Sequence, residues 1–185
     1  MPWCRRSRLT RPALRSIVHY RIVTRQETLV ATKTFTTEVC IACTPERVGS
    51  FLSDFPNYAK IHPLITAIRS SEPRPGAPDA PAPRKWYKVT DRLRLGPIPF
   101  SITYDVAMAS SGPQSLLFEV WQWPGVYLRN RTSWQAAAAG GTYLHEEVVV
   151  HAPLLLLFTV VRTAQAAHRR SFAVLKAKLE SEVIP

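Results

Sequence analysis

The sequence predicts an α+β domain in which a curved antiparallel sheet of seven strands wraps around one long C-terminal helix. Three observations support this prediction. Segments of alternating apolar and polar residues recur along the chain, short helical stretches follow the first of them, and apolar residues at helical spacing close the sequence. A bent sheet around a single helix leaves part of its interior unfilled, so we expect an internal cavity that holds a small apolar molecule.

The first strand and two short helices occupy the beginning of the domain. Residues 33–42 alternate between an apolar and a polar face, which predicts a half-buried strand. Thr44 suits the N-cap of a helix and Pro45 its first position. The sequence DFPNY at residues 54–58 ends this helix and starts a second one, which stops at His62-Pro63.

Six further segments are predicted to be strands, because apolar and polar residues alternate in them and Gly or Pro separates neighbours. They span residues 64–71, 85–95, 98–108, 115–123, 126–136 and 142–151. Residues 73–84 contain five prolines, which cannot pair in a sheet, so we expect an exposed loop there.

Residues 153–182 form the predicted C-terminal helix. Its apolar stripe advances in steps of three and four residues through Leu154, Leu157, Phe158, Val161, Gln165, His168, Phe172, Leu175 and Leu179. The run APLLLLFTVV at residues 152–161 is ten residues long, whereas a membrane span needs about 20. We interpret this run as the buried first half of the helix and expect no stable membrane insertion; the alternative is a surface that touches a membrane.

Residues 1–30 are predicted to be a basic, disordered tail, and residues 31–185 a ligand-binding domain. Seven arginines precede the first acidic residue, Glu27, and without them the formal charge of +11 falls to +4. The domain is only mildly basic and its charges are scattered, so we expect no nucleic-acid binding. The tail has three interpretations: an organellar transit peptide, a disordered basic arm, or an over-extended gene model in which Val30 stands for the start.

The three cysteines indicate neither a disulfide framework nor a zinc site. Cys40 and Cys43 are followed by no second pair and by no suitably spaced histidine, so we expect ordinary buried or half-buried thiols, no metal and no cofactor. A chain without a disulfide framework fits a reducing compartment, and we expect the cytoplasm. A mitochondrial location is the alternative if the tail is a transit peptide.

Two segments resemble a known superfamily. The sequence CTPERVGSFLSDFPNYAKIHPLI at residues 43–65 looks like its proline-started helix ending in a Phe/Tyr-bearing turn, and SWQAAAAGGTYLHEEVVV at residues 133–150 looks like its last hairpin. Together with the order of elements, they resemble the helix-grip fold of the START-like, or SRPBCC, superfamily, which includes polyketide cyclase/dehydrase-like and coenzyme-Q-binding proteins. The resemblance covers residues 33–182 and implies binding of lipids, polyketides, sterols or quinones.

The Gly140-Gly141 pair predicts which side chains share the concave face of the last hairpin. If these glycines form a two-residue turn, residues equally distant from them face each other, so Trp134 pairs with Glu147 and Asn130 with His151. The concave face then carries Leu128, Asn130, Thr132, Trp134, His145, Glu147, Val149 and His151. The convex face carries Arg129, Arg131, Ser133 and Glu146, and a slip of one residue would reverse the assignment.

Three candidate acid–base residues follow from this placement. Glu147 and His145 would lie on one face, where a buried carboxylate needs a partner, and His168 on the last helix would complete a polar patch beside Gln165. The alternative is a hydrogen-bonded, water-filled end of the cavity without chemistry. His62, at the mouth of the sheet, either gates the cavity or stabilises a turn.

The predicted ligand-binding residues combine aromatic, aliphatic and polar side chains that we place around the cavity. They are Phe51, Phe55, Tyr58, Tyr87, Phe100, Ile102, Tyr104, Phe118, Asn130, Trp134, Val149, His151, Leu157, Val161 and Gln165. The sequence has no nucleophile elbow, phosphate-binding glycine loop, dinucleotide fingerprint or zinc-protease motif, which favours a binding protein over an enzyme.

Three functions agree with these observations. The first is a carrier or sensor of a hydrophobic or amphipathic small molecule such as a lipid, polyketide or quinone. The second is a polyketide cyclase or dehydratase that uses Glu147, His145 and His168 for proton transfer. The third is a quinone or lipid chaperone with the basic tail as its membrane or organelle address. The sequence leaves the oligomeric state open.

Overall fold

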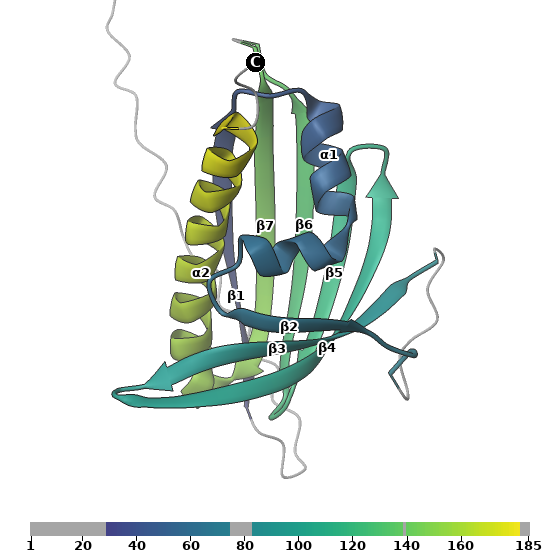
Figure 1. The fold of residues 1–185 in the computed structure, drawn as a ribbon. Helices are drawn as coiled ribbons and strands as arrows, with labels where there is room; N and C mark the ends of the chain where they lie inside the picture. Colours follow the sequence, from purple (N-terminus) through teal and green to yellow (C-terminus); the bar gives the residue numbers. More distant parts are fainter. Residues whose placement is uncertain (1–28, 75–82, 139, 182–185) are drawn as a thin grey trace, which may run out of the picture.

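The computed structural model describes residues 29–74, 83–138 and 140–181, and its elements follow the predicted order (Figure 1). They are β1 (Val30–Ile41), α1 (Pro45–Ser53), η1 (Phe55–Lys60), β2 (Ile65–Ser70), β3 (Lys85–Leu95), β4 (Ile98–Gly112), β5 (Ser115–Gln122), β6 (Val126–Ala136), β7 (Thr142–Pro153) and α2 (Leu154–Ser181). The seven strands form one antiparallel sheet in the order β1-β7-β6-β5-β4-β3-β2. The predicted fold class is confirmed. Most of the predicted N-terminal tail and part of the proline-rich loop lie outside the described residues.

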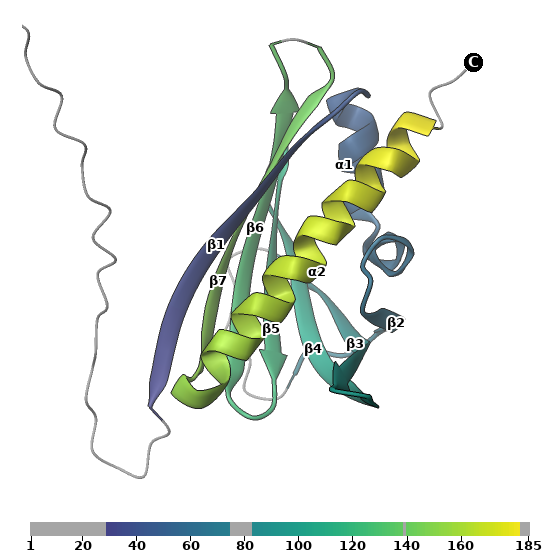
Figure 2. The ribbon, with the colours of Figure 1, turned by 90° about the vertical axis from the view of Figure 1, so that its left-hand side faces the viewer.

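The long helix α2 lies diagonally across the concave side of the sheet, and α1 and η1 lie on that same side (Figure 2). The three helical elements therefore cover one face of the sheet and leave the other face outward. This arrangement gives the domain an inner layer between α2 and the strands, which is where a functional site would be enclosed.

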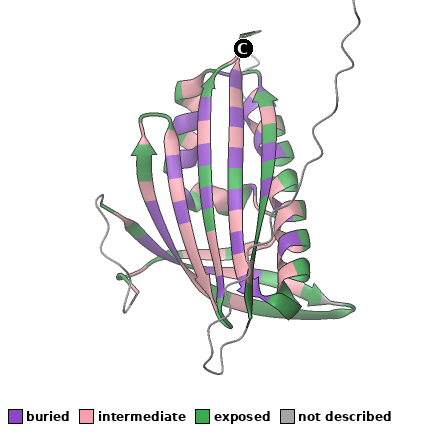
Figure 3. Cartoon of the chain, turned by 180° about the vertical axis from the view of Figure 1, so that it is seen from behind, coloured by how far each residue is buried: buried purple, intermediate pink, exposed green. Residues whose placement is uncertain are grey.

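The alternation of residues along the strands decides which face is buried. Figure 3 shows the sheet from its convex side, where buried residues alternate with more exposed ones along the central strands. One buried cluster surrounds α1, η1 and the C-terminal half of α2, and a smaller one lies under the N-terminal half of α2. On β7, Leu144, Val148 and Val150 have an exposed fraction of 0% and point toward α2.

The β6–β7 hairpin differs from the prediction in its loop length. Ala136 lies opposite Thr142, so the loop comprises the five residues 137–141 rather than two. The Gly141 carbonyl accepts a hydrogen bond from the Ala137 N–H at 3.0 Å, and both glycines have positive φ. The glycines thus close a longer loop instead of forming the turn by themselves.

The longer loop shifts the register of β7 against β6 by an odd number of residues, which reverses its faces. Trp134 pairs with Leu144 and Thr132 with Glu146. The predicted pairings of Trp134 with Glu147 and of Asn130 with His151 were wrong. His145, Glu147, Val149 and His151 therefore lie on the convex face, and Glu146 lies on the concave face. The placement of Asn130, Thr132 and Trp134 on the concave face was correct.

Helix α1 rests on the sheet through a contact that tolerates no side chain. Gly49 of α1 faces the indole of Trp134 on β6, and a Cβ atom on Gly49 would lie 2.9 Å from the Trp134 Nε1 atom. The indole is itself buried, with an exposed fraction of 6%, so it has little room to move away. The absence of a side chain at position 49 therefore sets how closely α1 approaches the sheet.

We expect Gly49→Val to lower the free energy of unfolding by about 2 kcal/mol, because the added methyl groups overpack the contact with Trp134. Urea denaturation followed by circular dichroism measures this change. Ser50→Val is the matched control, since Ser50 is the next residue of α1 and is exposed. Equal effects of the two substitutions would contradict the packing explanation.

Candidate functional site

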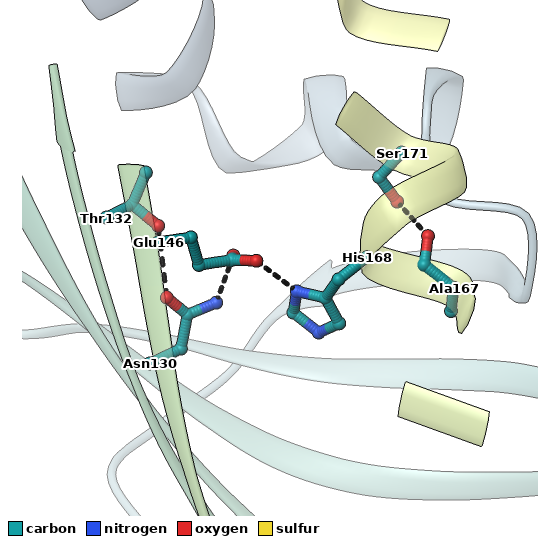
Figure 4. Close-up of polar contacts among 6 residues, drawn as sticks. All are labelled: Asn130, Thr132, Glu146, Ala167, His168 and Ser171. Carbon is teal, nitrogen blue, oxygen red and sulfur yellow. Dashed lines mark hydrogen bonds and ion pairs between the residues drawn. The ribbon is translucent and has the colours of Figure 1, made fainter. Parts of the chain in front are cut away.

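A buried polar cluster joins β6, β7 and α2 in the inner layer of the domain (Figure 4). The Glu146 side chain reaches from β7 to His168 on α2, with 2.7 Å between its Oε2 atom and the His168 Nδ1 atom. Its other oxygen, Oε1, accepts a hydrogen bond from the Asn130 Nδ2 atom at 2.6 Å. Glu146 has an exposed fraction of only 3%, and these two partners compensate the burial of its charge.

The neighbours of Asn130 fix the orientation of its amide. Thr132 lies two residues along β6 on the same face and donates a hydrogen bond from its Oγ1 atom to the Asn130 Oδ1 atom at 3.0 Å. This leaves the Asn130 NH₂ group to donate to Glu146. Ser171, one turn beyond His168, bonds instead to the Ala167 carbonyl within α2. The cluster is therefore an ordered chain from Thr132 to His168.

The environment of His168 favours its charged form. Burial by itself lowers the pKa of His168, but the charge of Glu146, its hydrogen bond and the charge of Asp91 together raise the pKa above its ordinary value. When it is protonated, the His168 ring forms an ion pair with the Glu146 carboxylate.

His62, which follows η1, lies beside His168 in the opposite state. The two ring centroids are 5.8 Å apart and the rings are nearly perpendicular. Burial, with the positive charge of His168, lowers the pKa of His62 to about 3, so this imidazole stays neutral at physiological pH. The cluster thus pairs a histidine whose pKa is raised with one whose pKa is lowered.

An aspartate and two tyrosines complete the polar region. Burial raises the pKa of Asp91 on β3 to about 6, although a hydrogen bond with Tyr104 and the charge of His168 oppose this shift. Burial and the charge of Asp91 raise the pKa of Tyr104 on β4 well above its ordinary range. Burial and the charge of Glu146 do the same to Tyr58 on η1. These mutual influences indicate that the groups share one region of low polarity.

Four buried polar atoms of this region have no hydrogen-bond partner among the described residues. They are the Thr37 Oγ1, Tyr58 Oη, His62 Nδ1 and Asp91 Oδ1 atoms. Thr37 pairs with Glu146 across β1 and β7, which places it next to the cluster. Most buried polar groups in proteins have a hydrogen-bond partner, so this region of the described structure contains hydrogen-bonding capacity that the protein itself does not use.

An aromatic wall adjoins the polar cluster. The Phe55 ring of η1 lies 4.6 Å from the ring centroid of Tyr87, 5.2 Å from that of Tyr58 and 5.7 Å from that of Phe118. Tyr58 belongs to both groups, because its ring packs on Phe118 while its hydroxyl is in the polar region. The inner layer therefore combines an aromatic side with a polar side.

Two pockets open at the surface, away from this cluster. One of about 660 Å³ lies between α1 and Leu179 near the end of α2, and Phe51 contributes to its lining. The other, of about 390 Å³, lies beside the β3–β4 hairpin and includes Phe100. None of the residues in the polar cluster lines either pocket. In this conformation the aromatic side chains of η1 instead occupy space over the sheet that we expected to be hollow.

The structure brings many of the predicted site residues to the inner layer. From the strands, Tyr87, Ile102, Tyr104, Phe118, Asn130 and Trp134 lie on the concave face, and Phe55 and Tyr58 cover them from η1. Leu157 and Val161 of α2 pack over the opposite end of the sheet, and Gln165 is half-buried. Phe51 and Phe100 lie at the two surface pockets instead.

Four predicted site residues lie on the convex side because of the longer hairpin loop. Glu147 is exposed, and the nearest His145 and Glu38 atoms are 3.8 Å apart at the surface. His151 bonds to Thr32 at 2.8 Å, and Val149 is half-buried beside it. The proposed Glu147–His145 pair on the inner face was therefore wrong, whereas His168 does face the interior.

Glu146, Asp91 and Thr37 were missed as candidates, although the sequence contained a signal for the first of them. Leu144, Val148, Val150 and Ala152 share the parity of Glu146, and this series is more apolar than the one that contains His145 and His151. A comparison of the two series would have favoured the correct face. Among the described residues, no three of the His, Cys, Asp and Glu side chains are arranged to hold a metal ion.

Comparison with known proteins adds a family model and several solved structures. Residues 32–180 match the model of a family described as polyketide cyclase / dehydrase and lipid transport. No curated protein matches the sequence. The fold is similar to the di-domain ARO/CYC BexL from the BE-7585A biosynthetic pathway, with a TM-score of 0.61 and 18% identity over 83% of this chain and 51% of that chain. This chain thus spans about half the length of that protein.

Two other solved structures match over most of their own length. A START superfamily protein from Mycobacterium smegmatis has a TM-score of 0.58 and 14% identity over 80% of this chain and 98% of that one. The ZhuI aromatase/cyclase from Streptomyces sp. R1128 has a TM-score of 0.56 and 14% identity over 76% and 90%. Identities this low establish a common fold and nothing about the reaction.

We expect Glu146→Gln to lower the pKa of His168, because the substitution removes the charge that opposes the effect of burial. A histidine whose native pKa is raised stabilises the fold fully below its unfolded pKa, and this contribution is lost as the pH rises through the native pKa. The stability difference between the wild type and E146Q should therefore shrink as the pH rises through that value.

NMR titration of the imidazole signals measures the pKa, and urea denaturation at several pH values measures the stability difference. Glu147→Gln is the matched control, because Glu147 is the next residue but lies on the exposed face. A His168 titration curve that E146Q leaves unchanged would contradict the assignment of the pair.

Proposed function

Because the chain belongs to the polyketide cyclase/dehydrase and lipid transport family, we propose that it binds an amphipathic small molecule between α2 and the concave face of the sheet. The observation that carries this proposal is the group of four buried polar atoms without partners, which lies next to an aromatic wall. We place the polar end of the ligand at the cluster and its apolar body against the wall.

The polar end of the ligand would satisfy the protein atoms that now lack partners. A buried polar group without a hydrogen bond costs about 1–3 kcal/mol, so a ligand that supplies partners gains from each one it satisfies. His62 Nδ1 and Asp91 Oδ1 suit a hydroxyl or carbonyl group, as does the Tyr58 hydroxyl. The ligand should therefore carry several oxygen atoms.

The apolar body of the ligand would take over contacts that the aromatic side chains now make with one another. Phe55 and Tyr58 both belong to η1, a short 3₁₀ helix, so displacement of this one element uncovers the face of Phe118 and Tyr87. Aromatic rings stack favourably on flat partners. A planar, oxygenated ring system, such as an aromatic polyketide or a quinone, fits this wall better than a saturated acyl chain does.

We expect the purified protein to bind a hydroxylated anthraquinone or a ubiquinone analogue more tightly than a saturated fatty acid. Native mass spectrometry and fluorescence titration measure this binding. Asp91→Asn or Glu146→Gln should weaken it by about tenfold, since each disturbs the polar end, whereas Glu147→Gln on the convex face should not. Equal affinity for the fatty acid, or insensitivity to both inner substitutions, would contradict the proposed orientation.

A cyclase or dehydratase is the second candidate, and the opposite pKa shifts of two neighbouring groups favour it. His62 is neutral above a pH of about 3, and Asp91 stays protonated below a pH of about 6. The cluster therefore holds a free base and a free acid at once, which is the requirement for general acid–base catalysis. The matched structures named as ARO/CYC and aromatase/cyclase agree with this candidate.

The two groups would promote an intramolecular aldol condensation of a polyketone chain. His62 takes a proton from a carbon between two carbonyl groups, and the resulting enolate carbon bonds to a second carbonyl carbon of the same chain. Asp91 gives its proton to the alkoxide that forms. Loss of water then creates the double bond: the Asp91 carboxylate takes the remaining proton from the same carbon, and the proton on His62 leaves with the departing hydroxyl group. Both residues return to their starting protonation states, so no oxidant or reductant is needed.

We expect turnover of a linear polyketone thioester to fall about 100-fold or more in Asp91→Asn and in His62→Gln, with substrate binding weakened much less. The base must be neutral and the acid protonated, so kcat/KM should be highest between pH values of about 3 and about 6. Product formation followed by liquid chromatography measures the rate. Tight binding without turnover at any pH would leave the carrier function and exclude the enzyme.

A further inference from the structure

One end of the molecule exposes a group of large apolar side chains. The exposed fraction is 94% for Leu155, 88% for Trp123 and 74% for Phe158. The exposed set, which we call the apolar end, consists of Leu29, Val30, Trp123, Leu154, Leu155 and Phe158. Single exposed apolar residues are common, but several large ones together mark an interaction surface.

The members of the apolar end come from three segments that meet in space. The Leu154 N–H donates a hydrogen bond to the Leu29 carbonyl at 2.8 Å, which joins the start of β1 to the start of α2. The turn between β5 and β6, which carries Trp123, approaches α2 at Gly125, where an added Cβ atom would lie 3.8 Å from the Pro153 side chain. Figure 2 shows the start of β1, this turn and the start of α2 at the same lower end.

The turn between β3 and β4 reaches the same end of the molecule (Figure 1). At the start of β4, directly after this turn, the exposed fraction is 64% for Ile98 and 42% for Phe100. The lower part of the molecule thus carries a second group of exposed apolar side chains, at the β3–β4 turn.

The charges around these two apolar groups have one sign. Arg162 lies one turn after Phe158 on α2, Lys33 is exposed on β1, and Arg92 and Arg94 are exposed before the β3–β4 turn. The segments 29–37, 92–104, 121–129 and 148–179 contain no Asp or Glu. In the described part of the chain the exposed acidic residues, such as Glu38, Glu46 and Asp54, lie in other segments.

The N-terminal segment adds to this asymmetry. Residues 1–28 lie outside the described structure, but they contain seven arginines and one acidic residue, Glu27, and they join the domain at Leu29. Leu29 belongs to the apolar end and is held against Leu154. The most basic part of the sequence therefore precedes a residue of the apolar end in the chain.

We propose that the apolar end docks on an anionic phospholipid surface, with Leu155, Phe158 and Trp123 entering the acyl boundary. The described arginines Arg92, Arg94 and Arg162 contact phosphate groups. Apolar side chains ringed by basic ones are the combination that binds such a surface. A second copy of the chain would bring two basic surfaces together, which Coulomb repulsion disfavours. No described helix is long and apolar enough to cross a membrane, so the contact is peripheral.

The docking is tested by flotation of the full chain with vesicles of phosphatidylcholine alone and of phosphatidylcholine with phosphatidylglycerol. The chain should float with the anionic vesicles and less with the neutral ones, and added salt should weaken the binding. The double substitution Leu155→Glu/Phe158→Glu should reduce binding by about tenfold or more, because it removes two of the side chains that enter the bilayer.

The matched control is Ala173→Glu/Ala177→Glu, which adds the same two charges at two exposed positions about one turn apart on the same helix. It should bind nearly as the wild type does. If the first double variant does not fold, Arg92→Glu/Arg162→Glu tests the electrostatic part by itself. Flotation that none of these substitutions at the apolar end weakens would overturn the proposal. So would a dimer in analytical ultracentrifugation that Leu155→Glu/Phe158→Glu converts to a monomer.

Discussion

The contact between Glu146 and His168 holds the interior of this domain together. It ties β7 to α2, which crosses the concave face, and the Glu146 side chain that makes the contact has an exposed fraction of only 3%. A buried carboxylate demands partners, and removal of one partner of a buried ion pair costs roughly 3–5 kcal/mol. Asn130 and Thr132 extend the contact into β6, so the position of the helix over the sheet is set by polar geometry as well as by apolar packing.

The charges of this pair also affect the groups around it. Burial is the main cause of the lowered pKa of His62 and of the raised pKa of Tyr58, and the charges of His168 and Glu146 add to these two shifts. Asp91 completes the arrangement from β3. The two proposed functions use this same cluster, one to recognise oxygen atoms on a ligand and the other to move protons on a substrate. The family described as polyketide cyclase / dehydrase and lipid transport includes both in its name.

The fold was predictable because it rests on local sequence patterns, whereas the prediction of the site depended on the length of one loop. Alternation in β1 to β7 and the stripe of α2 establish the elements without reference to one another. The inner face of β7 depends instead on the length of the β6–β7 loop, and a Gly-Gly pair occurs in two-residue turns and in longer loops alike. The predicted register of β7 against β6 was wrong by an odd number of residues, so the prediction assigned Glu147 to the inner face instead of Glu146. Asp91 and Thr37 gave no signal, since a single polar residue on an apolar face has no periodicity to reveal it.

The close approach of Gly49 to Trp134 has a consequence for how such sequences can change over time. The two positions share one fixed volume between α1 and β6. A larger residue at position 49 can be accommodated only with a smaller residue at position 134. Neither backbone can move away without disrupting the hydrogen bonds of the sheet or the packing of the core around it. Homologous chains should accordingly show a reciprocal exchange of size between these sites, and a family lineage with a smaller residue at position 134 would be free to carry alanine or serine at position 49.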